Sequence, residues 1–480
     1  MDPDNRPAPF KRYPEARVHA LPKDLPLRGA PAAAALSGRV SPGATVDLDL
    51  LARLLFLSAG VTRVAEADGT VWFRAAASAG NLHPLEVYVA AGDIPGLDAG
   101  LYHFAPDVFG LEELSSGDCR ALVADAVADL QVAHSPLIVV VTGIPWRTAW
   151  KYGERGLRHV YWDAGTLLAN LLSAAEGHGM PANVLLGFID SALCRLLGID
   201  GVLEFPVAVI AVGGSAGPAG RREWSEPQFA ATELSPAPIV FPLSTRVQLA
   251  GNLDTAEQVA AWRATAVAGL PRAQDTVNPP AVANAEPIES VVLRRGSTRR
   301  MRRVVASAEL LSWPMAVATR HLPADVIPHG ASLLSHQLAV HAVQGLDPGL
   351  HQWVEGSARL RRAVPESEVR QLSQHLCLDQ PLGGDSAYTD FVCADLERIL
   401  DGYGDRGYRV PQLEAGVVAG RLQLAAFTLH HGGTGLTFFD EEIPAAFDTP
   451  AACMLTVAVG TPAYQAKPGG PPGRPTRLTR

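Results

Sequence analysis

Hydrophobic residues along the chain fall into short runs separated by a helical pattern. Residues 85–90, 137–142 and 205–212 are apolar runs of strand length, whereas residues 163–177 repeat apolar side chains with a helical period. An acidic run at residues 440–442 is typical of a helix start. The longest apolar runs are far below the roughly 18 residues that span a membrane. The pattern therefore predicts a mixed α and β protein with no membrane-spanning helix.

The chain also repeats itself. Residues 151–158 (Lys-Tyr-Gly-Glu-Arg-Gly-Leu-Arg) and 163–165 (Asp-Ala-Gly) return as residues 402–409 (Gly-Tyr-Gly-Asp-Arg-Gly-Tyr-Arg) and 414–416 (Glu-Ala-Gly). Both pieces are displaced by 251 residues (402 − 151 and 414 − 163). Further matches keep nearly the same spacing, at 95–102 against 344–351, 187–190 against 437–440 and 212–214 against 459–461. Such constant spacing indicates a tandem duplication.

The length of 480 residues agrees with this, because a single hydrophobic core rarely grows beyond about 250–300 residues. We expect a first domain at residues 1–214 and a second at residues 288–480. Residues 215–287 are rich in Pro, Ala, Ser and Gly and are expected to be a linker with one helix, at residues 255–270.

Charge and cysteine content exclude several classes of protein. Forty Lys and Arg against 49 Asp and Glu give a net charge of −9, which argues against general binding of nucleic acid or of a membrane surface. The five cysteines are far apart and never spaced as Cys-x-x-Cys, so neither a disulfide framework nor a zinc site is indicated. Residues 1–10 lack the apolar segment of a signal peptide. We expect a cytoplasmic protein with no metal.

The densest basic cluster in this acidic chain opens the second half, at residues 293–303. Within it Arg295, Ser297 and Arg299 alternate, so on an extended segment they project from one side. Two guanidinium groups and a hydroxyl would then surround one anion, such as a phosphate. A solvated or nucleic-acid-binding basic run is the alternative.

The first half carries a loop of small residues ahead of an apolar run. Ser78, Ala79, Gly80 and Asn81 precede residues 85–90. Small residues let a backbone approach a flat ligand closely, and Ser78 and Asn81 supply hydrogen-bonding groups for ring heteroatoms. An ordinary loop leading into a strand is the alternative.

Taken in order, these motifs resemble the nitroreductase superfamily of FMN enzymes. The resemblance rests on the Ser-x-x-Asn loop at residues 78–81 with its following proline, the Arg-x-Ser-x-Arg signature at residues 295–299, and the Lys-Tyr motif that opens residues 151–158. More narrowly, the motifs are similar to those of SagB-type (McbC-like) azoline dehydrogenases. The resemblance is strong over residues 70–214 and looser over residues 288–464.

This resemblance implies an α+β fold of two tandem FMN-binding nitroreductase-like domains. In the family two such units form an interlocked dimer with FMN at the interface. The Arg-x-Ser-x-Arg segment of one unit holds the phosphate and ribityl chain, and the Ser-x-x-Asn loop of the other faces the isoalloxazine ring. A tandem chain would form an intramolecular pseudo-dimer, either as a monomer or within a homo-oligomer.

Each half departs from the family pattern at a different place. Residues 30–39 stand where the first half's arginines would be, and residues 328–332 (Pro-His-Gly-Ala-Ser) stand where the second half's loop would be. One complete site then remains, which implies one FMN per chain, bound by Arg295, Ser297, Arg299, Ser78, Gly80 and Asn81. Basic residues after the last strand of each half could add phosphate contacts: Lys467 and Arg474, or Arg221 and Arg222.

The pair Lys151 and Tyr152 matches the catalytic Lys-Tyr pair of the azoline dehydrogenases. Aromatising a thiazoline or oxazoline ring requires removal of a proton from one ring carbon while hydride leaves the adjacent carbon for FMN. A buried lysine of lowered pKa could take the proton, with the tyrosine as a partner or relay. The second half has Gly402 in place of the lysine, in keeping with one active site. The alternative is a surface lysine beside a packed tyrosine.

The resemblance thus implies an FMN-dependent oxidoreductase that converts thiazoline or oxazoline rings to azoles in a peptide or carrier-bound substrate, with oxygen reoxidising the flavin. A cyclodehydratase is an expected partner. Two alternatives stay open: an NAD(P)H-dependent nitro- or quinone reductase, and a flavin-poor scaffold subunit of a peptide-modifying complex.

Overall fold

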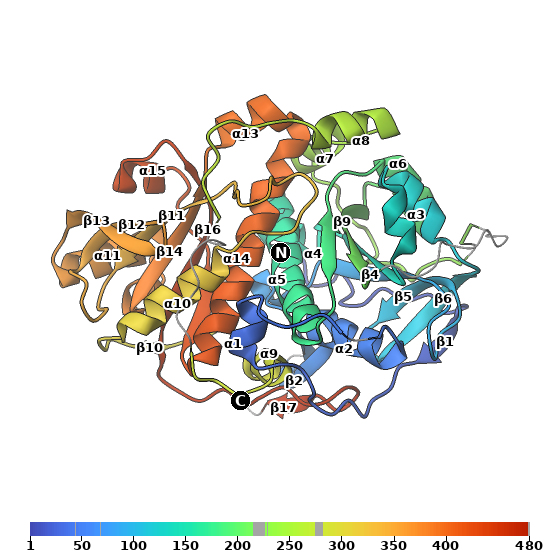
Figure 1. Cartoon of the computed structure of the whole chain (residues 1–480), viewed down its shortest axis with the longest axis horizontal. Helices are drawn as coiled ribbons and strands as arrows, with labels where there is room; N and C mark the ends of the chain where they lie inside the picture. The colour runs from blue at the N-terminus through green and yellow to red at the C-terminus, as the bar shows by residue number, and fades with distance from the viewer. Residues whose placement is uncertain (44, 68, 215–225, 228, 274–281, 479–480) are drawn as a thin grey trace.

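Two antiparallel sheets, one from each half of the chain, flank a pair of central helices (Figure 1). The computed structural model describes residues 1–478 except residues 44, 68, 215–225, 228 and 274–281. The first-half sheet has, in spatial order, the strands β1 (Arg17–Ala20), β6 (Gly110–Ser116), β5 (Gly100–Ala105), β4 (Leu85–Ala91), β7 (Leu137–Gly143), β9 (Phe205–Val212) and β8 (Ala182–Leu185). All three apolar runs of the sequence lie in this sheet.

The second sheet repeats this order. Its strands are, from one edge, β13 (Ser357–Ala363), β12 (Gly349–Val354), β11 (Ser335–Val340), β14 (Tyr388–Ala394) and β16 (Ala452–Pro462), with β15 (Gly432–Leu436) and β10 (Met301–Arg302) both paired to β16. Thus β6-β5-β4-β7-β9-β8 of the first half corresponds to β13-β12-β11-β14-β16-β15 of the second. The tandem α+β architecture predicted from the sequence is confirmed.

Helices cover the sheets in both halves. Those of the first half are α1 (Ala32–Leu36), α2 (Leu48–Ala59), α3 (Arg120–Ala126), α4 (Pro145–Tyr152), α5 (Gly156–Gly177) and α6 (Asp190–Leu197). Those of the second half are α9 (Ile288–Arg294), α10 (Ala308–Ala318), α11 (Glu366–Leu376), α12 (Pro381–Asp385), α13 (Leu396–Tyr403), α14 (Arg409–Thr428) and α15 (Glu442–Phe447). No helix of the described residues is long and apolar enough to cross a membrane.

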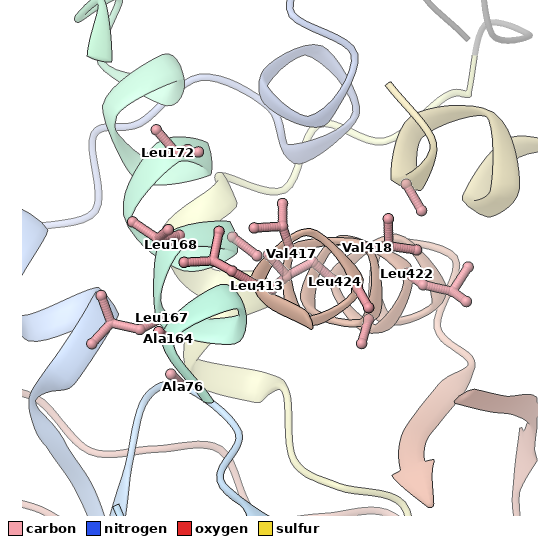
Figure 2. Packing of buried hydrophobic residues seen from close by; sticks show 14 of the residues in the cluster. Ala76, Ala164, Leu167, Leu168, Leu172, Leu413, Val417, Val418, Leu422 and Leu424 are labelled. Carbon is pink, nitrogen blue, oxygen red and sulfur yellow. The ribbon is translucent and has the colours of Figure 1, made fainter. Parts of the chain in front are cut away.

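The core of the molecule is the crossing of α5 and α14, which the duplication makes equivalent. Figure 2 shows α14 nearly end-on beside α5, with Leu413 lying between the two helices next to Leu168. Gly165 and Gly416 meet at the crossing: a Cβ on Gly416 would lie 2.9 Å from the Cα of Gly165 and closer still to the backbone of Trp162. The two backbones are therefore in direct contact, which only glycine permits here.

The linker contains two described helices, α7 (Pro242–Ala250) and α8 (Ala256–Arg263), where the sequence predicted one. Thr255 and Gln258 form a capping box that starts α8 near the expected position. The helix stops early because the Thr265 backbone amide bonds to the Trp262 carbonyl, while the Thr265 hydroxyl takes the Ala261 carbonyl that a longer helix would use. Helix α7 begins at Pro242, a residue that suits the first helical position.

The end of the chain returns to the first half. Strand β17 (Thr476–Leu478) pairs in parallel with β2 (Val61–Ala67), which also pairs with β3 (Gly69–Arg74). The C-terminus therefore lies beside β2 in Figure 1. The proposed second domain, residues 288–480, thus contributes a strand to a sheet of the first domain, so the two halves are interlocked.

The helix crossing predicts a specific sensitivity to side-chain volume. Gly416→Val should destabilise the protein by about 1–3 kcal/mol because the new side chain collides with the α5 backbone. Thermal unfolding should show a lower Tm for this variant. Gly43→Val is the matched control, since nothing lies within 4 Å of its Cβ position. Equal Tm values for the two variants would contradict the close approach.

Candidate functional site

A cavity of about 430 Å³ lies between the two halves, and both contribute to its walls. Its size is within the range of small-molecule and cofactor sites. Six of the residues singled out from the sequence line it: Ser78, Gly80, Lys151, Tyr152, Ser297 and Arg299. The fold thus brings together residues that are up to 221 positions apart (299 − 78).

The loop at residues 78–81 is anchored by a carboxylate that sequence analysis did not single out. Ser78 Oγ donates to Asp163 Oδ2 at 2.5 Å, and the Ala79 amide donates to Asp163 Oδ1 at 3.0 Å. Burial raises the pKa of Asp163 to about 7. Gly80 has a φ of +62°, and a Cβ there would lie 2.8 Å from Tyr152 Oη and 3.3 Å from Lys151 Nζ. The loop therefore presses its backbone against the Lys-Tyr turn.

Asn81 does not reach this cavity. Its amide nitrogen donates to the Trp72 carbonyl at 2.8 Å, and its Oδ1 lies 2.9 Å from the His83 ring. Asn81 itself has a φ of +59°, which turns its side chain to the far side of the loop. There it lines a smaller cavity with Trp72 and Arg74. In this conformation the Asn81 side chain therefore does not reach the position where a contact with a ring ligand was expected.

Lys151 and Tyr152 form the last turn of α4. The Tyr152 ring stacks on the buried His159 ring, with centroids 4.2 Å apart, and burial raises the pKa of Tyr152. Lys151 Nζ lies 5.3 Å from the centroid of the Tyr152 ring. Lys151 is exposed, so the expectation of a buried lysine is wrong: the residue lies in the last turn of α4, at the edge of the cavity.

In the second half, residues 295–299 run without regular structure along the cavity. Ser297 and Arg299 line it, whereas Gly296 and Thr298 line a separate groove on the opposite side. This is the alternation expected of an extended segment. Arg295 does not line the cavity: it is the residue that directly follows α9, and its side chain is buried.

The Arg295 guanidinium lies under the cavity wall. It donates to the Ala75 carbonyl at 2.7 Å and to Gln423 Oε1 at 3.3 Å, and Gln423 itself lines the cavity. Its Nε is buried and has no hydrogen-bond partner in the described part of the chain. Burial lowers the pKa of Arg295 to about 10. Among the described residues, the Arg295 Nε–H is therefore a buried hydrogen-bond donor without an acceptor, next to the cavity wall.

The first half holds this segment in place. Arg63 of β2 donates to the carbonyls of Leu293 at 2.6 Å, Arg295 at 3.1 Å and Lys467 at 2.8 Å. Beside it Glu289 of α9 binds Arg53 of α2 at 3.1 Å. The position of the anion-binding candidates thus depends on contacts across the interface.

The proposed additional phosphate contacts lie elsewhere. Lys467 is exposed next to the separate groove, where Ala466 and Pro468 form part of the wall. Arg474 lies in the arm that leads to β17. Neither residue lines the cavity, and Arg221 and Arg222 fall outside the described residues.

Arginine–aspartate bridges join the halves on both sides of the helix crossing. Arg155 and Arg158 of the first repeat bind Asp440 of the second, the latter contact at 2.5 Å. The acidic run at residues 440–442 does begin a helix, since Glu441 is the N-cap of α15 and Glu442 its first residue, and the Asp440 carboxylate just before it faces these arginines.

The reciprocal bridge joins Asp190 of the first half to Arg406 at 2.6 Å and Arg409 at 3.2 Å of the second. These residues occupy the same repeat positions as the first bridge. Arg406 and Asp190 are about 3–4% exposed, whereas Arg155 and Asp440 are about 30% exposed. The linker causes this difference, because the carbonyl of Gly251 accepts from Arg406 and the amide of Leu253 donates to Asp190.

The pseudo-symmetric counterpart of the cavity is occupied by the chain itself. The amide of Val184 in β8 donates to the Pro323 carbonyl at 2.8 Å, and the Asp325 amide donates back to the Val184 carbonyl at 3.0 Å. The Asp325 carboxylate accepts from the amides of Leu186 at 2.8 Å and Gly187 at 3.2 Å and pairs with Arg263 of the linker. The corresponding strand β15 faces the open cavity.

Two polar side chains of the open cavity are also replaced by apolar ones at its pseudo-symmetric counterpart. His159 and Thr166 line the open cavity, and their counterparts 251 residues later are Val410 and Val417. The anchor is nevertheless retained: Ser332 Oγ donates to Glu414 Oε1 at 2.7 Å, as Ser78 does to Asp163. The second half has therefore kept the anchoring serine, although the rest of the Ser-x-x-Asn motif is absent as expected, and valines replace His159 and Thr166.

Comparisons with known proteins agree with this architecture. Residues 43–214 match the model of the Nitroreductase family. A Methanocaldococcus jannaschii protein named putative nitroreductase is 27% identical over 34% of this chain and 78% of its own length. Trifolitoxin-processing protein TfxB of Rhizobium leguminosarum bv. trifolii is 28% identical over 35% of this chain, and the match spans 47% of that protein.

A crystal structure covers nearly the whole chain. It is the structure of a protein from Anabaena variabilis described as a putative nitroreductase. The two chains are 25% identical and superpose with a TM-score of 0.74, and the match covers 96% of this chain and 95% of the other. The likeness therefore extends over both halves and the linker region. Residues 43–214 accordingly form a Nitroreductase family domain, and the likeness of fold extends over the second half of the chain.

Proposed function

We propose that the cavity between the halves binds FMN and that each chain binds one. The fit rests on the donor set: the Arg299 guanidinium and Ser297 hydroxyl line the cavity, and the buried Arg295 Nε lacks a partner among the described residues. These groups suit a phosphate and a polyhydroxyl chain. Gly80 lets the loop backbone lie against the Lys-Tyr turn at the cavity, since a Cβ there would meet Tyr152 Oη.

A single site per chain is favoured by the closed counterpart. There the Asp325 carboxylate accepts from the amides of Leu186 and Gly187, directly after β8, and pairs with Arg263 of the linker. A planar ligand could enter only if the bridge between β8 and residues 323–325 opened. His159 and Thr166 of the open cavity are also replaced by valines in this copy.

The reaction that we propose is oxidation of thiazoline or oxazoline rings in a peptide substrate. Bound FMN would supply the hydride acceptor for this chemistry. Lys151 is the group best placed to take the proton, because it lies at the solvent edge of the cavity beside Gly80, where a peptide would arrive. Tyr152, stacked on His159, forms the cavity wall beside it. The observation that best supports this proposal is that the Lys-Tyr pair stands at the cavity in one copy only, whereas the other copy has Gly402 in place of the lysine.

A role in peptide modification is supported by the likeness to the trifolitoxin-processing protein. The substrate would then be produced by a cyclodehydratase, which forms the azoline ring, and such an enzyme is the proposed partner. A nitro- or quinone reductase is the second candidate, favoured by the nitroreductase-like domain itself. Under anaerobic conditions, bleaching of the bound flavin by an azoline peptide supports the first reaction, and rapid bleaching by NAD(P)H alone supports the second.

Removal of one cavity arginine should weaken FMN binding. Arg299→Ala should raise the Kd for FMN about 10- to 100-fold, because an anionic ligand loses a charge-assisted hydrogen bond worth about 1.5–3 kcal/mol. Titration of the flavin-free protein, followed by flavin fluorescence, measures the change. Arg300→Ala is the matched control, because the neighbouring Arg300 is exposed and lies against the Tyr464 ring. Equal Kd values in the two variants would remove Arg299 from the site.

Substitution of the proposed proton acceptor should separate binding from turnover. Lys151→Ala should keep FMN binding within about threefold of wild type while kcat for an azoline peptide falls about 10²- to 10⁴-fold, the usual contribution of a general base. Lys23→Ala, which removes a lysine outside the cavity, should leave both values unchanged. Full activity of Lys151→Ala would exclude this lysine from catalysis.

A further inference from the structure

The turn that carries Lys151 and Tyr152 is not held by those two side chains. Among the described residues, Tyr152 makes a stacking contact with His159, and Lys151 lies over the Tyr152 ring. Neither contact fixes a direction as a hydrogen bond does. Helix α4 ends at Tyr152, and the next residue, Gly153, has a φ of +57°. The placement of both side chains over the cavity therefore depends on what fixes the backbone after them.

Glu154 fixes that backbone to the linker. Its carboxylate accepts hydrogen bonds from the Leu243 amide at 3.0 Å, the Ser244 amide at 2.7 Å and Ser244 Oγ at 2.6 Å. These donors belong to the first turn of α7, where a negative charge also interacts favourably with the helix dipole. Partial burial acts in the opposite direction, but the hydrogen bonds from α7 lower the pKa of Glu154.

The linker also packs along α4. The Trp146 indole donates to Ser235 Oγ at 3.0 Å, and its ring stacks on Phe241 with centroids 6.3 Å apart. Phe241 directly precedes α7, so the apolar contact and the Glu154 hydrogen bonds hold the same end of the linker helix. Both ends of the Lys-Tyr helix are thus attached to the linker.

The other end of α7 leads into the buried bridge between Asp190 and Arg406. The Gln248 carbonyl in α7 accepts from Arg409, and Tyr161 of α5 donates to Gln248 Oε1 at 2.5 Å. Gly251, directly after α7, accepts from Arg406 at 2.9 Å. One nine-residue helix therefore connects the buried Asp190 bridge to the turn at the cavity.

The duplication supplies an internal comparison. The counterpart of Glu154 is Asp405, 251 residues later, in the copy that has lost the lysine. Asp405 lines the same surface groove as Glu154 and α7, but in the described part of the chain its carboxylate accepts no hydrogen bond from a linker helix. Among the described residues, the N-terminus of α7 thus binds the carboxylate of Glu154, in the copy that retains Lys151, although the linker also contacts Arg406 and Arg409 of the other half.

We propose that Glu154 is a positioning residue that, through the N-terminus of α7, holds the Lys151 and Tyr152 turn in register over the cavity. This inference rests on the proposed function of that turn. Glu154 itself does not line the cavity, so it acts on turnover through the backbone of residues 151–154. Misplacement of a reacting group by about 1 Å is enough to reduce turnover about 100-fold.

The test compares Glu154→Ala with Glu154→Gln, which keeps an acceptor oxygen for α7, and with Asp405→Ala as the matched control. Hydrogen exchange of the FMN-bound protein, followed by mass spectrometry, reports directly on residues 145–156. We expect faster exchange there in Glu154→Ala, intermediate exchange in Glu154→Gln and no change in Asp405→Ala. The kcat for an azoline peptide should fall at least tenfold in Glu154→Ala and recover to within about threefold in Glu154→Gln, with FMN affinity constant.

Three results would overturn the inference. These are unchanged exchange over residues 145–156 in Glu154→Ala, exchange that rises across the whole first half with a lowered Tm, or the same loss of kcat in Asp405→Ala. Lys151→Ala measured in parallel keeps the two proposals apart. If Lys151→Ala stays active, the proposed function fails, whereas full activity of Glu154→Ala beside an inactive Lys151→Ala refutes the positioning role alone.

Discussion

Direct contact between the α5 and α14 backbones at Gly165 and Gly416 is the constraint on which the rest of the structure depends. Because the two helices occupy the same position in the two repeats, their crossing relates the halves by an internal pseudo-twofold axis. The close approach brings the α5 end that carries His159 and Trp162 against the second half and brings Gln423 of α14 against the first. A larger residue at either glycine would separate the walls of the cavity along with the helices.

The two halves share one fold but differ at their two equivalent sites, and different sets of residues account for the likeness and for the difference. The residues kept in both repeats, such as the bridging arginines and the serine–carboxylate anchor, bind the halves together or hold a loop. Residues kept in one repeat only, such as Lys151 and His159, line the open cavity. The linker reinforces this division: it covers the Asp190 bridge, pairs Arg263 with Asp325 in the closed copy, and attaches to Glu154 in the open one. In one copy the chain itself bridges the position, and the other keeps a cavity with polar walls.

The duplication and the cavity were accessible from the sequence because both leave local patterns. Constant spacing fixed the equivalence of the halves, and short motifs marked Ser78, Gly80 and the Lys-Tyr turn. Asn81 was misjudged because its left-handed backbone, which turns the side chain away, has no signature in a single sequence. The partners of Asp163 and Asp440 were missed because they are 85 and 285 positions away in the chain. Asp163 did leave a signal, since an acid stands at this apolar helix position in both repeats.

One complete flavin site per chain is the central claim, and flavin content tests it most directly. The purified protein, saturated with FMN and freed of excess, should release one FMN per chain on denaturation, as measured by visible absorbance against protein concentration. Two FMN per chain would show that the position closed by Asp325 binds flavin as well. No bound FMN after saturation would contradict the assignment of the cavity and leave a scaffold role for the protein.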